Sequence, residues 1–209
     1  MKTWLGVMGI AVLLTGCQNS TTKVASVVPR PAPDAVVSDD DMTVEVFGPD
    51  HSETTMCGTD AGEGPQLSEA VDRLVGYGYL IDPSRTLVAH AATVDGRSAD
   101  VIWRFAAGID GAEGGIFEVV TGDGRTVLSY GVVGDRVEPI PARTHSELRK
   151  RDGGPEGVGA LYGCLGLAIT LFYACMNSCF ADGGSPPACA AICAASAVMT
   201  FLRCLFTMA

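Results

Sequence analysis

The sequence predicts an α+β protein that ends in a disulfide-stapled antiparallel pair of helices. Runs of β-branched and aromatic residues, broken by Asp-Gly pairs, indicate a small antiparallel sheet. One short segment with apolar residues at helical spacing indicates a single helix packed on that sheet. Six of the eight cysteines fall in an apolar C-terminal block, at positions symmetric about one turn.

The first 16 residues resemble a bacterial lipoprotein signal peptide. Lys2 precedes an apolar run of 11 residues, Trp4 to Leu14, which is too short to span a bilayer. A lipobox-like motif follows, in which Leu14, Thr15 and Gly16 lead to Cys17. The resemblance implies cleavage before Cys17 and attachment of acyl chains such as palmitate to that residue.

This interpretation assigns the protein to the cell envelope, with a lipid bilayer as its partner. Several acyl chains make a durable anchor, because each buried CH₂ contributes about 0.8 kcal/mol. By resemblance, Gln18 after the cysteine suits transport to the outer membrane, where the host has one. Export also places the remaining cysteines in an oxidising compartment.

Residues 17–64 are rich in Ser, Thr, Pro, Asp and Gly, which predicts a flexible acidic tether. Within it, 43–47 reads as one short strand, and Asp39-Asp40-Asp41 as a solvated acidic run. Cys57 has no partner in the predicted pairing, so it is expected to be an unpaired thiol or to form an intermolecular disulfide.

Residues 65–138 predict the small α+β domain. A helix is expected from about Gln66 to Val75, where apolar residues recur at helical spacing. Four or five antiparallel strands are expected between about 87 and 137. Turns are expected at Asp95-Gly96 and Asp123-Gly124, because type I′ turns need positive φ.

Residues 139–157 predict a linker. It contains two prolines, the basic run 149–151 and a Gly-Gly-Pro sequence. Basic runs and glycine pairs can mark processing sites, although any exposed linker is also open to incidental proteolysis. The sequence therefore leaves open whether this linker is a processing site.

Residues 158–209 predict a cysteine-rich helical hairpin. Outer, middle and inner cysteine pairs are all centred on Gly184, within the turn signal around Gly183 and Gly184. Residues equidistant from the turn face each other in an antiparallel hairpin, and the cysteines of each helix share one face. Of 15 possible pairings, this geometry selects Cys164–Cys204, Cys175–Cys193 and Cys179–Cys189.

Two other interpretations of this block stay open. Thiolates four residues apart could bind a metal, but no histidine joins them and an oxidising compartment favours disulfides, so no metal or other cofactor is predicted. The first helix is also long enough to cross a membrane, since 158–181 carries no charge. The basic run before it opposes that orientation, because export would leave those charges outside.

Composition and motifs disfavour two functional classes. The net charge of −10 offers no electrostatic gain on a phosphate backbone, so no nucleic-acid partner is expected. No phosphate-binding loop, zinc-protease motif or nucleophile elbow occurs. The three histidines, His51, His90 and His145, are scattered, so no catalytic residues are assigned and the protein is predicted not to be an enzyme.

An acidic exported α+β segment followed by a cysteine-rich apolar end is similar in layout to halocin-like bacteriocin precursors. The resemblance implies that the upstream part protects the producer and the end is a membrane-directed antagonist. The alternative is an envelope-structural or binding lipoprotein, whose hairpin docks on a partner protein or on the α+β domain, or inserts in the membrane. A neutral, apolar, rigid hairpin is compatible with both functions.

Overall fold

The computed structural model describes residues 31–49, 65–133, 136–140 and 155–208. Its elements are listed here in chain order: β1 (Ala35–Ser38), β2 (Met42–Phe47), α2 (Pro65–Gly76), β3 (Tyr79–Thr93), β4 (Ser98–Gly108), β5 (Glu113–Thr121), β6 (Gly124–Val133), β7 (Arg136–Pro139), α3 (Pro155–Ala181) and α4 (Pro186–Met208). The predicted α+β class is confirmed, as is the helix from about 66 to 75, which is α2.

The seven strands form one antiparallel sheet in sequence order, from β1 to β7. Both predicted hairpins form: a turn that contains Asp95-Gly96 joins β3 to β4, and Gly122-Asp123 joins β5 to β6, so that Gly124 is already the first residue of β6. The expected type I′ conformation is wrong at both Asp95 and Asp123, because no described non-glycine residue has positive φ. Gly96 alone supplies the left-handed residue of the turn between β3 and β4, with φ of 87°.

The strand expected at 43–47 is confirmed as β2, whereas β1 was not expected, so the two strands correct the expectation that 35–47 belong to a flexible tether. Residues 35–47 form β1 and β2, and β2 pairs with β3. In the turn between them, Asp39 Oδ1 accepts hydrogen bonds from the backbone N–H groups of Asp41 and Met42, at 2.9 and 3.0 Å. The acidic run is therefore a turn that is locally bonded, and the alternating residues Met42, Val44 and Val46 are buried beyond it.

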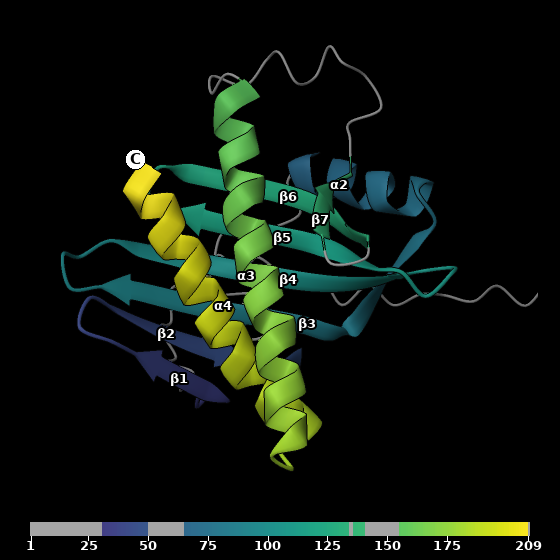
Figure 1. Cartoon of the computed structure of the whole chain (residues 1–209). Helices are drawn as coiled ribbons and strands as arrows, with labels where there is room; N and C mark the ends of the chain where they lie inside the picture. The colour runs from purple at the N-terminus through teal and green to yellow at the C-terminus, as the bar shows by residue number, and fades with distance from the viewer. Residues whose placement is uncertain (1–30, 50–64, 134–135, 141–154, 209) are drawn as a thin grey trace, which may run out of the picture.

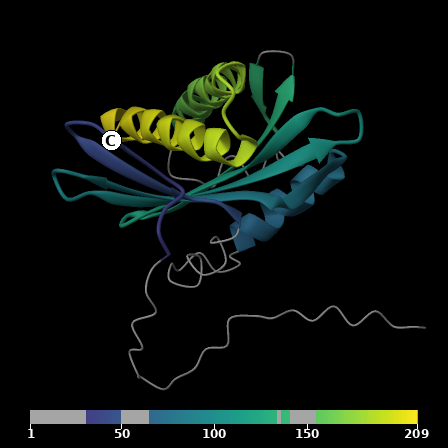
Figure 2. The ribbon, with the colours of Figure 1, turned by 90° about the horizontal axis from the view of Figure 1, so that it is seen from below.

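Helices cover both faces of the sheet (Figures 1 and 2). On one face, α2 packs through Leu67, Ala70 and Leu74 in a small core that includes Ile116 and Ile140. On the opposite face, α3 and α4 form the helical hairpin and lie across the strands. Ile140 is part of the α2 core, although it falls in the expected linker.

The hairpin and the sheet share one hydrophobic core. Buried side chains of β1 to β6 and of both hairpin helices belong to a single cluster, in which Trp103 and Phe117 of the sheet meet Phe172 and Phe201. The expected division between a 65–138 domain and a separate 158–209 hairpin differs from this packing. An apolar helix looks the same in sequence whether it is covered by its own chain or by another partner, so packing on the α+β domain was only one of the alternatives there.

Candidate functional site

The stapled hairpin is the most distinctive feature of the described chain, and its predicted pairing is confirmed. Disulfides join Cys164 to Cys204, Cys175 to Cys193 and Cys179 to Cys189, with Cα–Cα distances of 5.7, 5.5 and 5.8 Å. The helices therefore approach closely along their whole paired length. None of the described cysteines is left free.

The hairpin turn depends on its two glycines. Gly183 has φ of 81°, a conformation that other residues rarely adopt. Gly184 lies against the innermost disulfide, where a Cβ atom would come within 2.5 Å of Cys189 Sγ and 2.6 Å of Cys179 Sγ. Glycine at 184 thus lets the backbone pass directly over the disulfide.

The inner face of the hairpin is covered by aromatic rings of the sheet. The Phe172 ring lies 4.9 Å from that of Trp103, and the Phe201 ring lies 4.8 Å from that of Phe117. Trp103 Nε1 donates a hydrogen bond of 2.7 Å to the buried hydroxyl of Tyr130. Burial raises the pKa of Tyr130 far above its usual value, so its hydroxyl stays neutral.

Polar contacts also attach the hairpin to the sheet. The Tyr162 hydroxyl donates to the carbonyl oxygen of Ser129 at 3.0 Å. Burial, and then a hydrogen bond with Glu113, raises the pKa of Tyr173. Arg203 of α4 pairs with Asp39 in the β1–β2 turn. These contacts orient the hairpin, since apolar packing alone is not directional.

The opposite side of α3 is exposed and carries no charge. We define this outer face of α3 by nine exposed residues: Ala160, Gly163, Leu167, Thr170, Leu171, Ala174, Asn177, Ser178 and Ala181. At about 100° per residue they cover roughly 120° of the helix. Leu167 and Leu171 are 52% and 43% exposed. The Thr170 hydroxyl donates a hydrogen bond of 2.9 Å to the Gly166 carbonyl, so its donor is already used within the helix.

Both hairpin helices are long and apolar enough to cross a membrane, judged by length and composition. Core helices of soluble proteins meet the same test, so burial must distinguish them. In the most apolar stretch of α3 only 28% is buried within the molecule, against 56% for α4. Contacts within the described chain therefore bury most of the apolar stretch of α4, whereas no described residue covers the outer face of α3.

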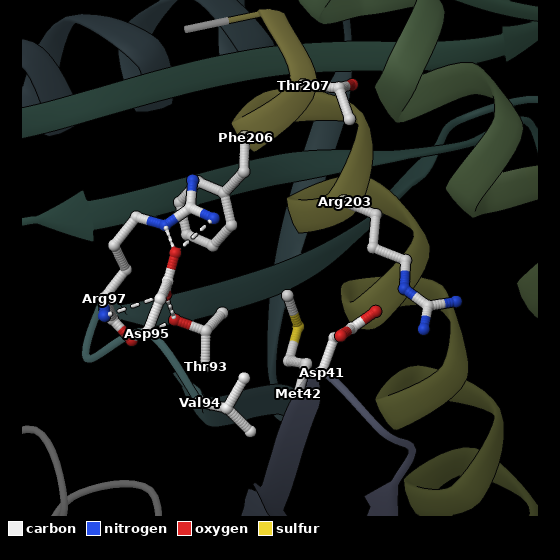
Figure 3. Close-up of a pocket in the computed structure, with 9 residues that line it drawn as sticks. All are labelled: Asp41, Met42, Thr93, Val94, Asp95, Arg97, Arg203, Phe206 and Thr207. Atoms are coloured by element: carbon white, nitrogen blue, oxygen red, sulfur yellow. Dashed lines mark hydrogen bonds and ion pairs between the residues drawn. The ribbon is translucent and has the colours of Figure 1, made fainter.

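A pocket of about 470 Å³ lies where the last turns of α4 meet the β1–β2 and β3–β4 turns (Figure 3). The Arg97 guanidinium stacks over the Phe206 ring at 4.4 Å and pairs with Asp95 at 2.8 Å. Hydrogen bonds from Arg97 and Thr93 lower the pKa of Asp95 to about 2. Asp41 and Arg203 line the other side of the pocket. Charged side chains of both signs line the pocket. The contacts of Arg97 with Phe206 and of Arg203 with Asp39 hold the C-terminal end of α4 against the sheet.

Charged residues on the α2 face are also held in pairs. The carboxylate of Glu118 is fully buried and lies 2.8 Å from Arg104 Nη1 and 3.1 Å from Arg125 Nε. His90 Nδ1 lies 2.8 Å from Asp100 Oδ1 on the neighbouring strand. Within the described ranges, no group of three or more Cys, His, Asp and Glu residues could hold a metal ion.

Several predicted site residues lie outside the described residues. These are the lipidation residue Cys17, its motif Leu14, Thr15 and Gly16, and the thiol Cys57. Sequence reasoning missed the pairing of Asp39 with Arg203 and the contact of Tyr162 with Ser129. A signal for the first existed, because Arg203 is the only basic residue of the predicted hairpin.

Comparison with known proteins adds no relative, since no family model, curated protein or solved structure matches the chain. The functional conclusion must therefore be drawn from the hairpin itself.

Proposed function

We propose that the protein is a lipid-anchored, non-enzymatic protein of the bacterial envelope that lays the outer face of α3 on the membrane holding its anchor. The observation that carries this proposal is the contrast between two helices of similar apolarity, one covered and one exposed. Exposed apolar patches on soluble domains commonly mark protein or membrane contacts. A bilayer suits this patch, because its nine residues include no charge.

The proposed anchor supports this geometry. Residue 31, where the described chain begins, lies 14 positions after Cys17. Even fully extended, this segment reaches at most about 50 Å. The described body would thus stay close to the bilayer, and tethering raises the effective concentration of a weak contact.

The contact is expected to be shallow and reversible. Full burial of a leucine side chain contributes about 1.5–3 kcal/mol, and Leu167 and Leu171 are about half exposed, so each would add about 1 kcal/mol. Such values are too small for independent membrane binding of high affinity. They are sufficient to orient a protein that acyl chains already hold at the surface.

Flotation with uncharged phosphatidylcholine vesicles tests this proposal. The sample is residues 18–209, which lack the acylated cysteine but contain every described element. We expect weak binding that falls several-fold in the Leu167→Gln/Leu171→Gln variant. Leu80→Gln is the matched control, because Leu80 is 69% exposed but lies on β3. Absence of binding, or equal loss in the control, would contradict the proposal.

A second candidate is the bacteriocin-like antagonist, in which the hairpin is released. One observation favours it: all three described disulfides lie within the hairpin, so none of them would hold it after cleavage in 141–154. Release would also expose the sheet residues Trp103, Phe105 and Phe117, at a cost on the order of 10 kcal/mol with their neighbours. We therefore favour docking of the intact protein.

Cleavage separates the two candidates. A protease site inserted at 149–151 should leave the two fragments associated in gel filtration, because the shared core persists. A hairpin that leaves the sheet after cleavage and permeabilises vesicles would support the antagonist instead.

A further inference from the structure

We infer that the outer face of α3 prefers membrane surfaces without net charge, so that anionic lipid weakens docking. This inference rests on the proposed function and names the class of bilayer to which that same face binds. It follows from where the described charges lie relative to the face.

The hairpin offers no attraction to an anionic surface. From 159 to 207 the only charged residues are Asp182 in the turn and Arg203 near the end of α4. Arg203 is already paired with Asp39. Helices that lie on anionic membranes usually carry several Lys or Arg residues beside their apolar face, and these supply much of the binding.

The rest of the protein is repelled by such a surface. The whole chain has a net charge of −10. Exposed carboxylates lie beside the hairpin, since Asp40 and Asp41 are in the β1–β2 turn and Asp41 lines the pocket at the end of α4 (Figure 3). The sheet lies behind the outer face by roughly the 10 Å diameter of a helix. That distance is about one Debye length at physiological salt, so repulsion is felt and depends on salt.

Three hydroxyl groups of the hairpin helices, one of them on the outer face of α3, support the same preference. Thr170, Ser196 and Thr200 each donate a hydrogen bond back to the carbonyl four residues earlier, at 2.9, 3.2 and 3.0 Å. Hydroxyls satisfied in this way need no headgroup partner. The other polar side chains of the outer face, Asn177 and Ser178, carry no charge, so no group in the contact favours anionic over neutral lipid.

The test compares vesicles of phosphatidylcholine alone with vesicles containing about 30% anionic phosphatidylglycerol, at about 20 and 150 mM salt. With residues 18–209, we expect several-fold weaker binding to the anionic vesicles at low salt, and a smaller difference at high salt. The variant Asn177→Lys/Ser178→Lys adds two charges to the outer face. It should bind anionic vesicles several-fold better than the unmodified protein.

The outcomes separate this inference from the proposed function. Equal or stronger binding to anionic vesicles overturns the inference alone, provided that the leucine variant still loses binding to neutral ones. A lysine variant that gains nothing on anionic vesicles overturns the proposed function and the inference with it, because the outer face would then not meet the bilayer. No binding to either vesicle, with or without the leucines, overturns both.

Discussion

The two helices of the hairpin have nearly the same composition and opposite surroundings. Both are uncharged over a length that could span a membrane, and three disulfides hold them side by side. Yet 56% of the most apolar stretch of α4 is buried within the molecule, against 28% for α3, whose outer face is exposed. The difference shows that apolarity in this block serves two purposes, since both helices contribute to the shared core and α3 also leaves an uncharged face outside it.

The largest effect should distinguish a buried leucine of α4 from an exposed leucine of α3. Leu202 is fully buried and Leu171 is 43% exposed. Leu202→Ala should lower the free energy of unfolding by about 4 kcal/mol, because it leaves a cavity in the shared core. Leu171→Ala should cost about 0.5 kcal/mol or less. Denaturant melts of both variants measure this. Similar costs would mean that α3 is covered in solution.

The disulfides give the next largest effect, because they hold the exposed helix to the buried one. Cys164–Cys204 closes a sequence separation of 40 residues. With the inner pairs intact, Cys164→Ala/Cys204→Ala should cost about 3 kcal/mol, mainly through loop entropy. The Cys179–Cys189 disulfide closes a sequence separation of only 10 residues. Its removal in Cys179→Ala/Cys189→Ala should therefore lower the free energy of unfolding by less. Hydrogen exchange should show the first half of α3 opening in the outer variant. Equal exchange in both variants would contradict this role.

The disulfide pairing was predictable because it depends on local spacing. Three pairs symmetric about Gly184 on one helical face leave one simple arrangement, and no distant segment is needed to specify it. The central strands and α2 were also readable, since β-branched runs, Asp-Gly pairs and helical spacing are local signals. These elements were predictable because the residues of each segment are sufficient to indicate its local structure.

The remaining parts depend on partners far away in the chain. β2 pairs with β3 across the whole of α2, and its run Met42–Phe47 is short and follows an acidic turn. The residues 43–47 indicated this strand from the sequence, but nothing local indicated which strand it pairs with. Similarly, the apolar residues show no periodicity that indicates which side of α3 or α4 is covered, because both helices are apolar on nearly every side. The stapled hairpin was therefore predictable from the sequence, but the side of it that packs against the sheet was not.

A smaller effect concerns the end of α4, which polar contacts fix to the sheet. The pKa of Asp95 is lowered to about 2, below its ordinary value near 4. The pairing with Arg97 therefore stabilises the protein above about pH 4 and is lost as the pH falls from 4 to 2. Asp95→Asn should reduce the fall in melting temperature over this range by about 1 °C at most, since water screens the exposed pair. Identical pH profiles would show that the contact adds nothing.

The smallest effect on stability should occur on the outer face itself. Thr170→Val keeps a β-branched side chain of the same shape, and the lost hydroxyl bonds only to the Gly166 carbonyl of its own helix. Melts should therefore change by less than about 0.5 kcal/mol. Binding to neutral vesicles should rise about twofold, because a methyl group replaces a polar group on the face. Thr207→Val is the matched control, since Thr207 has a similar back bond of 2.9 Å but lies beside the pocket at the end of α4. A rise with Thr207→Val and none with Thr170→Val would move the membrane contact from α3 to α4, and so reverse the roles of the two helices.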